Sequence, residues 1–456
     1  MRNGYRAPAR APGSSSVTHL RTKHRRLVAT TVASLAFALA VACGGDRNGD
    51  ATPTSAPSTP GATGAVSVLG IWADDELASF EAMVEPWESE PGRAMEFIGT
   101  RDITPLLTTR VDGNNPPDVA LPAEIGLFQR FAREGRLTPL SACPGLDEEV
   151  RANYPETFVQ LGTVDGVLYG FFMKADTKAT VWYNPRFFAD HNAAPLEADA
   201  TFDDLVALSD RIRDSGTPPW SNGQAANGGT GFPGSDTIQQ ILINDAGVET
   251  YDAVTAGTLP YTDPAVRDAW EKFGRLVLGA GALAQGDGAA ATTTPFQDSA
   301  YPPFEDPPRA AMVHLGGFAE GFISERFPAA TPSEDFNFFP WPGGAVTGGA
   351  NIAYAFNSEP ATCSFLSHIA SAQAQEIWVQ RGGFTSVNKG VDEFAYPDSV
   401  SRALARQLIV APVFRFDLDD AIGGPAQQAI FQGVVQYLRD ASTLDQILAS
   451  VEAARD

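Results

Sequence analysis

The stretch from Ala65 to Gly135 decides the fold, because it alternates short strand patterns with amphipathic helix patterns. It opens on Ala65–Trp72 (AVSVLGIW), a β-rich run that ends in an aromatic residue. In Asp74–Ser89 the apolar residues recur at the spacing of an amphipathic helix. The alternation continues through strand candidates Glu96–Gly99 and Pro117–Leu121 and helix candidates Asp102–Asp112 and Ile125–Glu134. This β-α-β-α-β order predicts an α/β fold with a parallel, helix-covered sheet.

Sheets of this kind bind ligands beyond the carboxyl ends of their strands. Two segments occupy such ends here, Trp72–Asp75 and Leu121–Glu124. Topology alone therefore makes them candidate binding segments. Farther along, Thr201–Asp214 is predicted as a helix with a capping box, and Thr217–Gly234 reads as a long Gly/Pro/Asn-rich loop.

Composition excludes several classes of function. The 456 residues carry a formal charge of −23, and residues 1–42 hold seven basic and no acidic side chains. The remainder therefore has 25 basic and 55 acidic residues, a net charge of −30. So acidic a domain is a poor partner for nucleic acid and for anionic lipid. With 43% hydrophobic and 19% charged residues, the chain is globular, and its length suits two lobes.

The N-terminus is expected to be an export signal. Arg21–Arg26 is basic, and Leu27–Ala42 is a 16-residue uncharged apolar run, shorter than the roughly 20 residues that a membrane span needs. It ends at Ala40–Gly45 (AVACGG), which resembles a bacterial lipobox and implies that Cys43 becomes the lipidated first residue. An uncleaved signal-anchor helix is the alternative. Residues 43–65 are Gly/Pro/Ser/Thr-rich and predict a flexible tether.

The two remaining cysteines, Cys143 and Cys363, are an even pair in a chain expected to be exported. Such a pair favours one disulfide, with two separate buried thiols as the alternative.

The usual catalytic and cofactor motifs are missing from the sequence. It contains no HExxH, no GxSxG, no GxxxxGK[ST] and no strand-linked GxGxxG, and its histidines are not spaced as metal ligands. We therefore expect no metal, no cofactor and no catalytic residues. A glycosidase stays open as an alternative, because it needs two carboxylates and no motif.

Several blocks resemble the family 1 extracellular solute-binding proteins, the maltose- and alpha-glucoside-type receptors of ABC importers. Asp165–Phe172 and Val181–Pro185 resemble the family's G-x-x-Y-G-x-P and W-Y-N stretches. Phe232–Asp236 resembles its W-P-G-T-D block, and Ala311–Phe318 its A-M-x-x-x-G-S-F block. The blocks follow in family order, and the resemblance covers essentially all of residues 66–456.

The resemblance implies a periplasmic-binding-protein-like fold, in which two α/β lobes close by a hinge around a carbohydrate. The expected boundaries are residues 1–42 for the signal peptide and 43–65 for the lipidated Cys and tether. Lobe 1 would span 66–176 and 346–386, and lobe 2 would span 177–345 and 387–456. The implied partners are a sugar and the membrane permease of an ABC importer. We expect a monomer, lipid-anchored outside the cytoplasm and without a nucleic-acid partner.

The family's sugar-contacting positions map onto residue types suited to carbohydrate, since aromatic rings cover the C–H faces and polar groups bind the hydroxyls. The implied ligand-binding residues are Trp72, Asp75, Leu121, Pro122, Glu124, Lys174, Asp176, Trp220, Phe232, Asp236, Phe318 and Phe431. Alternatives remain open for several of them. Trp72, Trp220 and Phe318 can instead pack in the core, and Lys174 and Asp176 can simply pair with each other. Arg415 and Asp417 can form an ion pair or face the cleft.

The sequence also departs from the family pattern. Phe232 replaces the Trp of W-P-G-T-D, Gly317 replaces the serine of G-S-F, and Asn351 ends a Gly-Ala-Asn run where the family has G-A-D. Ser221–Gln224 replaces a Cys-containing stretch of the alpha-glucoside branch. These changes lie near the implied pocket, so the ligand can differ from an alpha-glucoside. A glycosidase, or a sugar sensor or adhesin on the same fold, are the competing interpretations.

Overall fold

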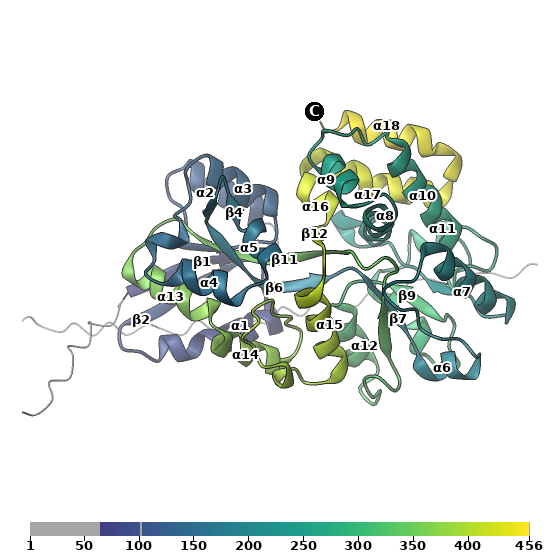
Figure 1. Cartoon of the computed structure of the whole chain (residues 1–456), viewed down its shortest axis with the longest axis horizontal. Coiled ribbons are helices and arrows are strands. Elements are labelled where there is room, and N and C mark those ends of the chain that lie inside the picture. Colours follow the sequence, from purple (N-terminus) through teal and green to yellow (C-terminus); the bar gives the residue numbers. More distant parts are fainter. Residues whose placement is uncertain (1–63, 101–102, 456) are drawn as a thin grey trace, which may run out of the picture. The chain divides into compact units, whose positions relative to one another are not determined.

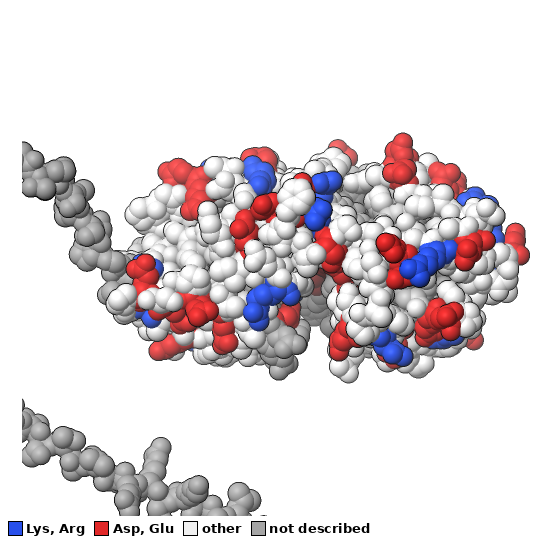
Figure 2. All heavy atoms as spheres, turned by 90° about the horizontal axis from the view of Figure 1, so that it is seen from below, with Lys and Arg blue, Asp and Glu red and all other residues white. Residues whose placement is uncertain are grey.

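A computed structural model describes residues 64–100 and 103–455 of the chain. The predicted signal peptide, Cys43 and nearly all of the tether lie outside these residues. Within the described ranges, no helix is long and apolar enough to cross a membrane. Figure 2 shows Asp and Glu side chains spread over the visible face of the molecule, with Lys and Arg interspersed among them.

The strands form two principal sheets. Among the described residues, the larger sheet has six strands in the order β12-β11-β3-β1-β2, with β6 also paired to β11. The smaller sheet has four strands in the order β10-β7-β9-β8, and β4 pairs with β5 in a separate hairpin. The bounds are β1 Gly64–Gly70, β2 Arg93–Gly99, β3 Val119–Leu121, β4 Thr163–Val164, β5 Val167–Leu168, β6 Gly170–Thr177, β7 Thr180–Tyr183, β8 Trp220–Ser221, β9 Met312–His314, β10 Asn337–Pro340, β11 Val346–Ala355 and β12 Phe414–Phe416.

Helices cover both sheets (Figure 1). Helix α1 packs against α13 and α14, and helix α8 packs against α10 and α17. The bounds are α1 Asp74–Glu88, α2 Ile103–Asp112, α3 Ile125–Arg133, α4 Leu146–Asn153, α5 Glu156–Leu161, α6 Pro185–Asp190, α7 Phe202–Asp214, α8 Phe232–Asp245, α9 Val248–Thr255, α10 Pro264–Val277, α11 Gly288–Ala291, α12 Ala319–Arg326, α13 Pro360–Ala370, α14 Ala372–Arg381, α15 Ser399–Val410, α16 Leu418–Ile422, α17 Gly424–Arg439 and α18 Leu444–Ala453.

The strand and helix order predicted for residues 65–135 is confirmed. β1 runs parallel to both β2 and β3, and α1, α2 and α3 follow the three strands in turn. The capping box at the start of α7 is also present, with Thr201 and Asp204 exchanging hydrogen bonds. The predicted loop at Thr217–Gly234 is shorter than expected. Its first part forms β8, because Trp220 and Ser221 pair with β9, and Phe232 already begins α8.

The chain passes from the larger sheet to the smaller sheet at Thr177–Thr180, between β6 and β7, and returns between β10 and β11. Figure 1 shows β6 and β11 side by side at this passage, and they pair as antiparallel neighbours. β12 lies beyond residue 387, in the stretch assigned to lobe 2, yet it pairs with β11 of the larger sheet. Sheet membership and the expected lobe boundaries therefore differ at β12.

Cys143 and Cys363 form a disulfide, with their Cα atoms 5.1 Å apart. Cys143 ends a short 3-10 turn and Cys363 lies in α13, so the bond joins segments 220 residues apart in sequence.

Candidate ligand-binding site

The carboxyl ends of several strands meet at one edge of the larger sheet. β1 and β3 are parallel, and β11 is antiparallel to both β3 and β6, so β6 runs in the same direction as β1 and β3. Trp72 follows β1, Glu124 follows β3, and Asp176 lies near the end of β6. The edge predicted from strand order thus exists, and it carries candidate residues from three strands.

Trp72 serves in part as packing. Its side chain is buried, with its ring 4.7 Å from that of Phe80 and 4.8 Å from that of Trp378. Its Nε1, however, is buried without a hydrogen-bond partner. Core packing accounts for the ring but leaves the indole N–H unsatisfied.

Lys174, Asp176 and Lys178 share one face of the chain, because side chains alternate along a strand. Lys174 does not pair with Asp176. Its Nζ lies 2.5 Å from Glu76 Oε1 and 5.8 Å from the centre of the Trp378 ring. Asp176 instead accepts a hydrogen bond from the backbone N–H of Phe318, at 3.1 Å.

The glycines before Phe318 explain that approach. A Cβ on Gly316 or Gly317 would lie 2.6 or 2.7 Å from a carboxylate oxygen of Asp176. Glycine at both positions therefore lets the start of α12 reach the carboxylate. Gly317, a departure from the family pattern, has a steric reason in this chain.

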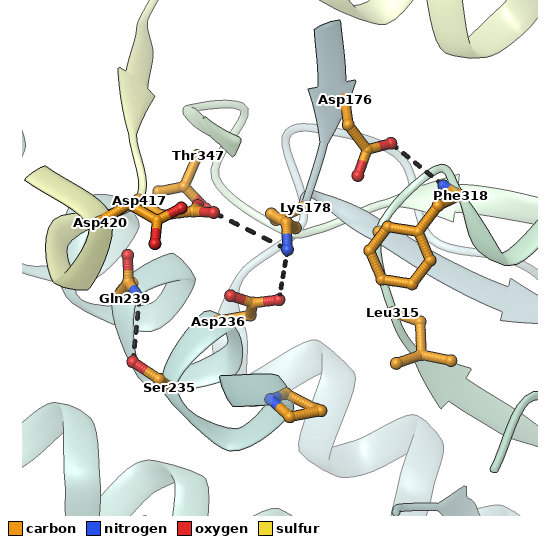
Figure 3. A network of polar contacts seen from close by, with 12 residues as sticks. Asp176, Lys178, Ser235, Asp236, Gln239, Leu315, Phe318, Thr347, Asp417 and Asp420 are labelled. Atoms are coloured by element: carbon orange, nitrogen blue, oxygen red, sulfur yellow. Dashed lines mark hydrogen bonds and ion pairs between the residues drawn. The ribbon is translucent and has the colours of Figure 1, made fainter. Parts of the chain in front are cut away.

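Lys178, just after β6, is the centre of a buried polar cluster (Figure 3). Its Nζ lies 2.8 Å from Asp236 Oδ2 and 3.7 Å from Asp417 Oδ2. The same ammonium lies 5.2 Å from the ring centre of Phe232 and 5.1 Å from that of Phe318. Four of the predicted residues are thereby brought together: Asp176, Phe232, Asp236 and Phe318.

Sequence reasoning missed Lys178. The signal was present, because Lys178 continues the two-residue spacing of Lys174 and Asp176. The sequence allows two interpretations of Asp417, an ion pair with Arg415 or a position facing the cleft. The structure rules out the ion pair, because Arg415 binds both carboxylate oxygens of Asp252 at 2.6 and 2.8 Å.

We define the Lys178 cluster as Lys178 with the five buried aspartates whose ionised form its positive charge favours, which are Asp176, Asp236, Asp417, Asp419 and Asp420. Burial raises the pKa of every one of these carboxyls, against the opposing charge of Lys178; Asp176 and Asp420 reach about 6. Burial also works against the charge of Lys178, but Asp236 and Asp417 outweigh it and raise the pKa of the ammonium. The cluster contains more carboxyl groups than its one lysine can neutralise.

Unsatisfied polar atoms collect at this edge of the larger sheet. The described residues include seven buried side-chain polar atoms without a hydrogen-bond partner. Four of them belong to residues at or just beyond the edge: Trp72 Nε1, Glu124 Oε2, Asn351 Nδ2 and Asp417 Oδ1. Asn351 is placed there because its neighbour Ile352 donates to the carbonyl of Pro122, at 2.9 Å. Buried polar groups are normally satisfied, so this concentration of unsatisfied atoms distinguishes the edge from the rest of the described structure.

The other predicted residues lie apart from the cluster or contribute backbone. Trp220 is buried in β8 and donates to Ser209 Oγ at 3.1 Å, which satisfies its indole. Leu121 is buried in register with Gly70. Phe431 is buried in α17, where its carbonyl approaches the glycine before Phe232. Asp75 lies in the first turn of α1, and its side chain is outside the described part of the structure.

Two further features bear on the chemistry. A cavity of about 540 Å³, lined by residues that include Phe338, Arg402 and Val410, opens beside α15 and contains none of the Lys178 cluster. Over residues 64–100 and 103–455, no group of three or more His, Cys, Asp or Glu side chains is arranged to hold a metal ion.

Comparison with known proteins decides the family. The family model for bacterial extracellular solute-binding proteins matches residues 82–406. The chain belongs to this family. Membership implies a location outside the cytoplasm, and the family and the relatives named below are binding proteins.

Among its relatives, the osmoprotective compounds-binding protein GgtB of Synechocystis sp. is 31% identical over 394 residues, covering 85% of this chain and 91% of the relative. The alpha-glucosides-binding periplasmic protein AglE of Rhizobium meliloti is 28% identical over 407 residues, covering 86% of this chain and 87% of the relative.

Solved structures show the same fold. The solute receptor AcbH, described as preferring β-D-galactopyranose, superposes with a TM-score of 0.71 at 16% identity, covering 86% of this chain and 97% of that one. RafE from Streptococcus pneumoniae superposes with a TM-score of 0.69 at 15% identity, covering 87% of this chain and 98% of RafE. The periplasmic-binding-protein-like fold is thus confirmed.

Proposed function

We propose that this chain is the substrate-binding receptor of an ABC importer and that it captures a carbohydrate at the edge where β1, β3 and β6 end. Family membership across residues 82–406 carries the proposal. The relatives are named for binding osmoprotective compounds and alpha-glucosides. The unsatisfied polar atoms of Trp72, Glu124, Asn351 and Asp417 suit a ligand rich in hydroxyl groups.

The accompanying arrangement is part of the same proposal. Two lobes, with the boundaries given above except that β12 joins the sheet of lobe 1, close around the ligand by motion at the passage between β6 and β7. Cys43 carries lipid and residues 43–63 tether the domain outside the cytoplasmic membrane, since Gly64 and Ala65 already belong to β1. The receptor works as a monomer and presents its closed form to the permease.

A thermal-shift panel tests carbohydrate binding. The purified protein is heated with galactose, maltose, trehalose, sucrose, raffinose and chitobiose in turn. A sugar present at about 100 times its dissociation constant should stabilise the folded state by about 2.7 kcal/mol. Absence of any shift across the panel contradicts carbohydrate capture. Sustained release of reducing ends from an oligosaccharide would instead support a glycosidase.

Trp72→Phe tests the edge as the binding site. The phenyl ring can still pack against Phe80 and Trp378, but the unpartnered indole N–H is lost. We expect the dissociation constant of the bound sugar to rise about tenfold, the size of one hydrogen bond to ligand. Isothermal titration gives the affinity.

Trp220→Phe is the matched control. It removes an indole N–H that Ser209 already binds, so it should lower the melting temperature and leave affinity unchanged. If both variants weaken binding equally, the assignment of Trp72 to the site and Trp220 to the core is wrong.

A further inference from the structure

Within the Lys178 cluster, Asp417 alone has a carboxylate oxygen that is both buried and without a hydrogen-bond partner. Asp417 comes directly after β12, and its backbone N–H donates to Gly348 O at 3.0 Å. Its Oδ2 faces Lys178, but its Oδ1 is buried without a partner, and the side chain is only 4% exposed.

The neighbouring carboxylates are engaged. Asp236 binds Lys178, and Asp420 accepts from Gln427 Nε2 at 2.7 Å. Asp419 accepts from both Ser235 Oγ and Gln239 Nε2. A buried carboxylate oxygen with no donor is costly, so a donor that completes Asp417 would be strongly favoured.

The surroundings of Asp417 indicate what kind of donor fits. Lys178 lies within ion-pair distance of Asp417, and the rings of Phe232 and Phe318 lie against the same ammonium. Aromatic faces beside a hydrogen-bond acceptor suit a sugar ring, whose C–H groups cover the rings while a hydroxyl donates.

Charge narrows the ligand class further. All five aspartates of the Lys178 cluster interact with Lys178, and Asp176 interacts also with Lys174. The nearby cations are engaged, since Lys174 is paired with Glu76 and Arg415 with Asp252. His314 donates from Nε2 to the Lys178 carbonyl, and its Nδ1 lies 2.8 Å from Thr237 Oγ1. Burial lowers the pKa of His314 to about 4, so it brings no positive charge at neutral pH. A ligand carboxylate brought here would meet like charge in a buried setting.

We propose that Asp417 contacts the bound sugar and that the Lys178 cluster makes the receptor select neutral or cationic sugars over anionic ones. Lys178 is the positioning residue, since it holds Asp236 and Asp417 on one side of the site. This inference rests on the proposed function and goes beyond it by assigning a charge preference to the ligand.

The test uses the sugar with the largest shift in the panel above and two derivatives of it. In one derivative a primary hydroxyl is oxidised to the uronate, and in the other it is replaced by an amine. Titration against the purified protein should show the uronate binding at least tenfold more weakly than the neutral sugar. The amine derivative should bind within threefold of the neutral sugar or more tightly. Equal affinity for the uronate overturns the charge preference.

Asp417→Asn and Asp419→Asn separate ligand contact from a structural role. Both exchange a buried carboxylate for an amide of the same shape at the start of α16. Asp417→Asn should weaken binding of the neutral sugar about tenfold. It should also reduce the difference in affinity between the neutral sugar and the uronate. The Asp419 carboxylate is held by Ser235 and Gln239. Asp419→Asn should therefore change the melting temperature but not the difference in affinity between the neutral sugar and the uronate.

If Asp417→Asn leaves both affinities unchanged while the sugar still binds, Asp417 is not a contact and only this inference falls. If no sugar in the panel binds the unmodified protein, the result contradicts both the proposed carbohydrate binding and this inference.

Discussion

Replacing Lys178 by Met is expected to destabilise the folded protein by about 3–5 kcal/mol at pH 8, because it leaves buried carboxylates without their cation. Asp236 and Asp417 both face the Lys178 ammonium, and both side chains are about 95% buried, with 5% and 4% exposed. Met fills a similar volume, so the loss reports charge more than packing. Chemical denaturation at fixed pH gives the free energy of unfolding.

The loss should depend on pH in a defined direction. Burial already raises the pKa of Asp176 to about 6 and raises that of Asp417 well above its ordinary value, and removing Lys178 raises both pKa values more. Between the ordinary carboxyl pKa of about 4 and these raised values, the folded state binds more protons than the unfolded chain. The free energy of unfolding therefore falls as pH rises, and the Lys178→Met variant should recover stability toward pH 5.

Lys174→Met is the control for this variant. Lys174 lies on the same strand face, but its partner Glu76 has a side chain 37% exposed, and such a pair contributes about 1 kcal/mol or less. Equal destabilisation by the two variants, or a Lys178→Met loss that does not change with pH, would show that the buried charges do not set the stability.

Breaking the Cys143–Cys363 disulfide should cost about 5 kcal/mol, because it releases a loop of roughly 220 residues in the unfolded chain. The Cys143→Ala/Cys363→Ala double variant should unfold at a lower denaturant concentration than the oxidised protein. Reductant should lower the midpoint of the parent protein and leave the double variant unchanged. Coincident unfolding of the oxidised protein and the double variant contradicts this prediction.

Local sequence patterns predicted most of the helices and strands discussed above. They did not predict β8, which depends on a contact between residues far apart in sequence. The strands and helices of residues 65–135 followed from hydrophobic spacing, and the start of α7 followed from Thr201 and Asp204. Trp220 was assigned to a loop because its neighbours are Pro, Asn and Gly. It forms a strand because β9, some 90 residues later, pairs with it, and no local signal contains that information.

The same distinction holds for the site. Strand order predicts Trp72 and Glu124 at one edge of the sheet, whereas Asp176 is implied only by the family resemblance. The role of Asp417 could not be predicted, because it depends on which of its two oxygens finds a donor. The two-residue spacing of Lys174 and Asp176 could have predicted that Lys178 shares their face. It could not predict the partners of Lys178, because Asp236 and Asp417 come from α8 and the end of β12, far away in sequence.

The position of β11 has a consequence for how the chain folds. This strand begins at Val346, yet it pairs with β3, β6 and β12 and so completes the interior of a sheet begun at Gly64. The larger sheet therefore has high contact order, and its closure waits for residues nearly 300 positions after its first strand. Folding should be slow for this reason, and a fragment ending before Val346 should expose the open edges of β3 and β6 and aggregate.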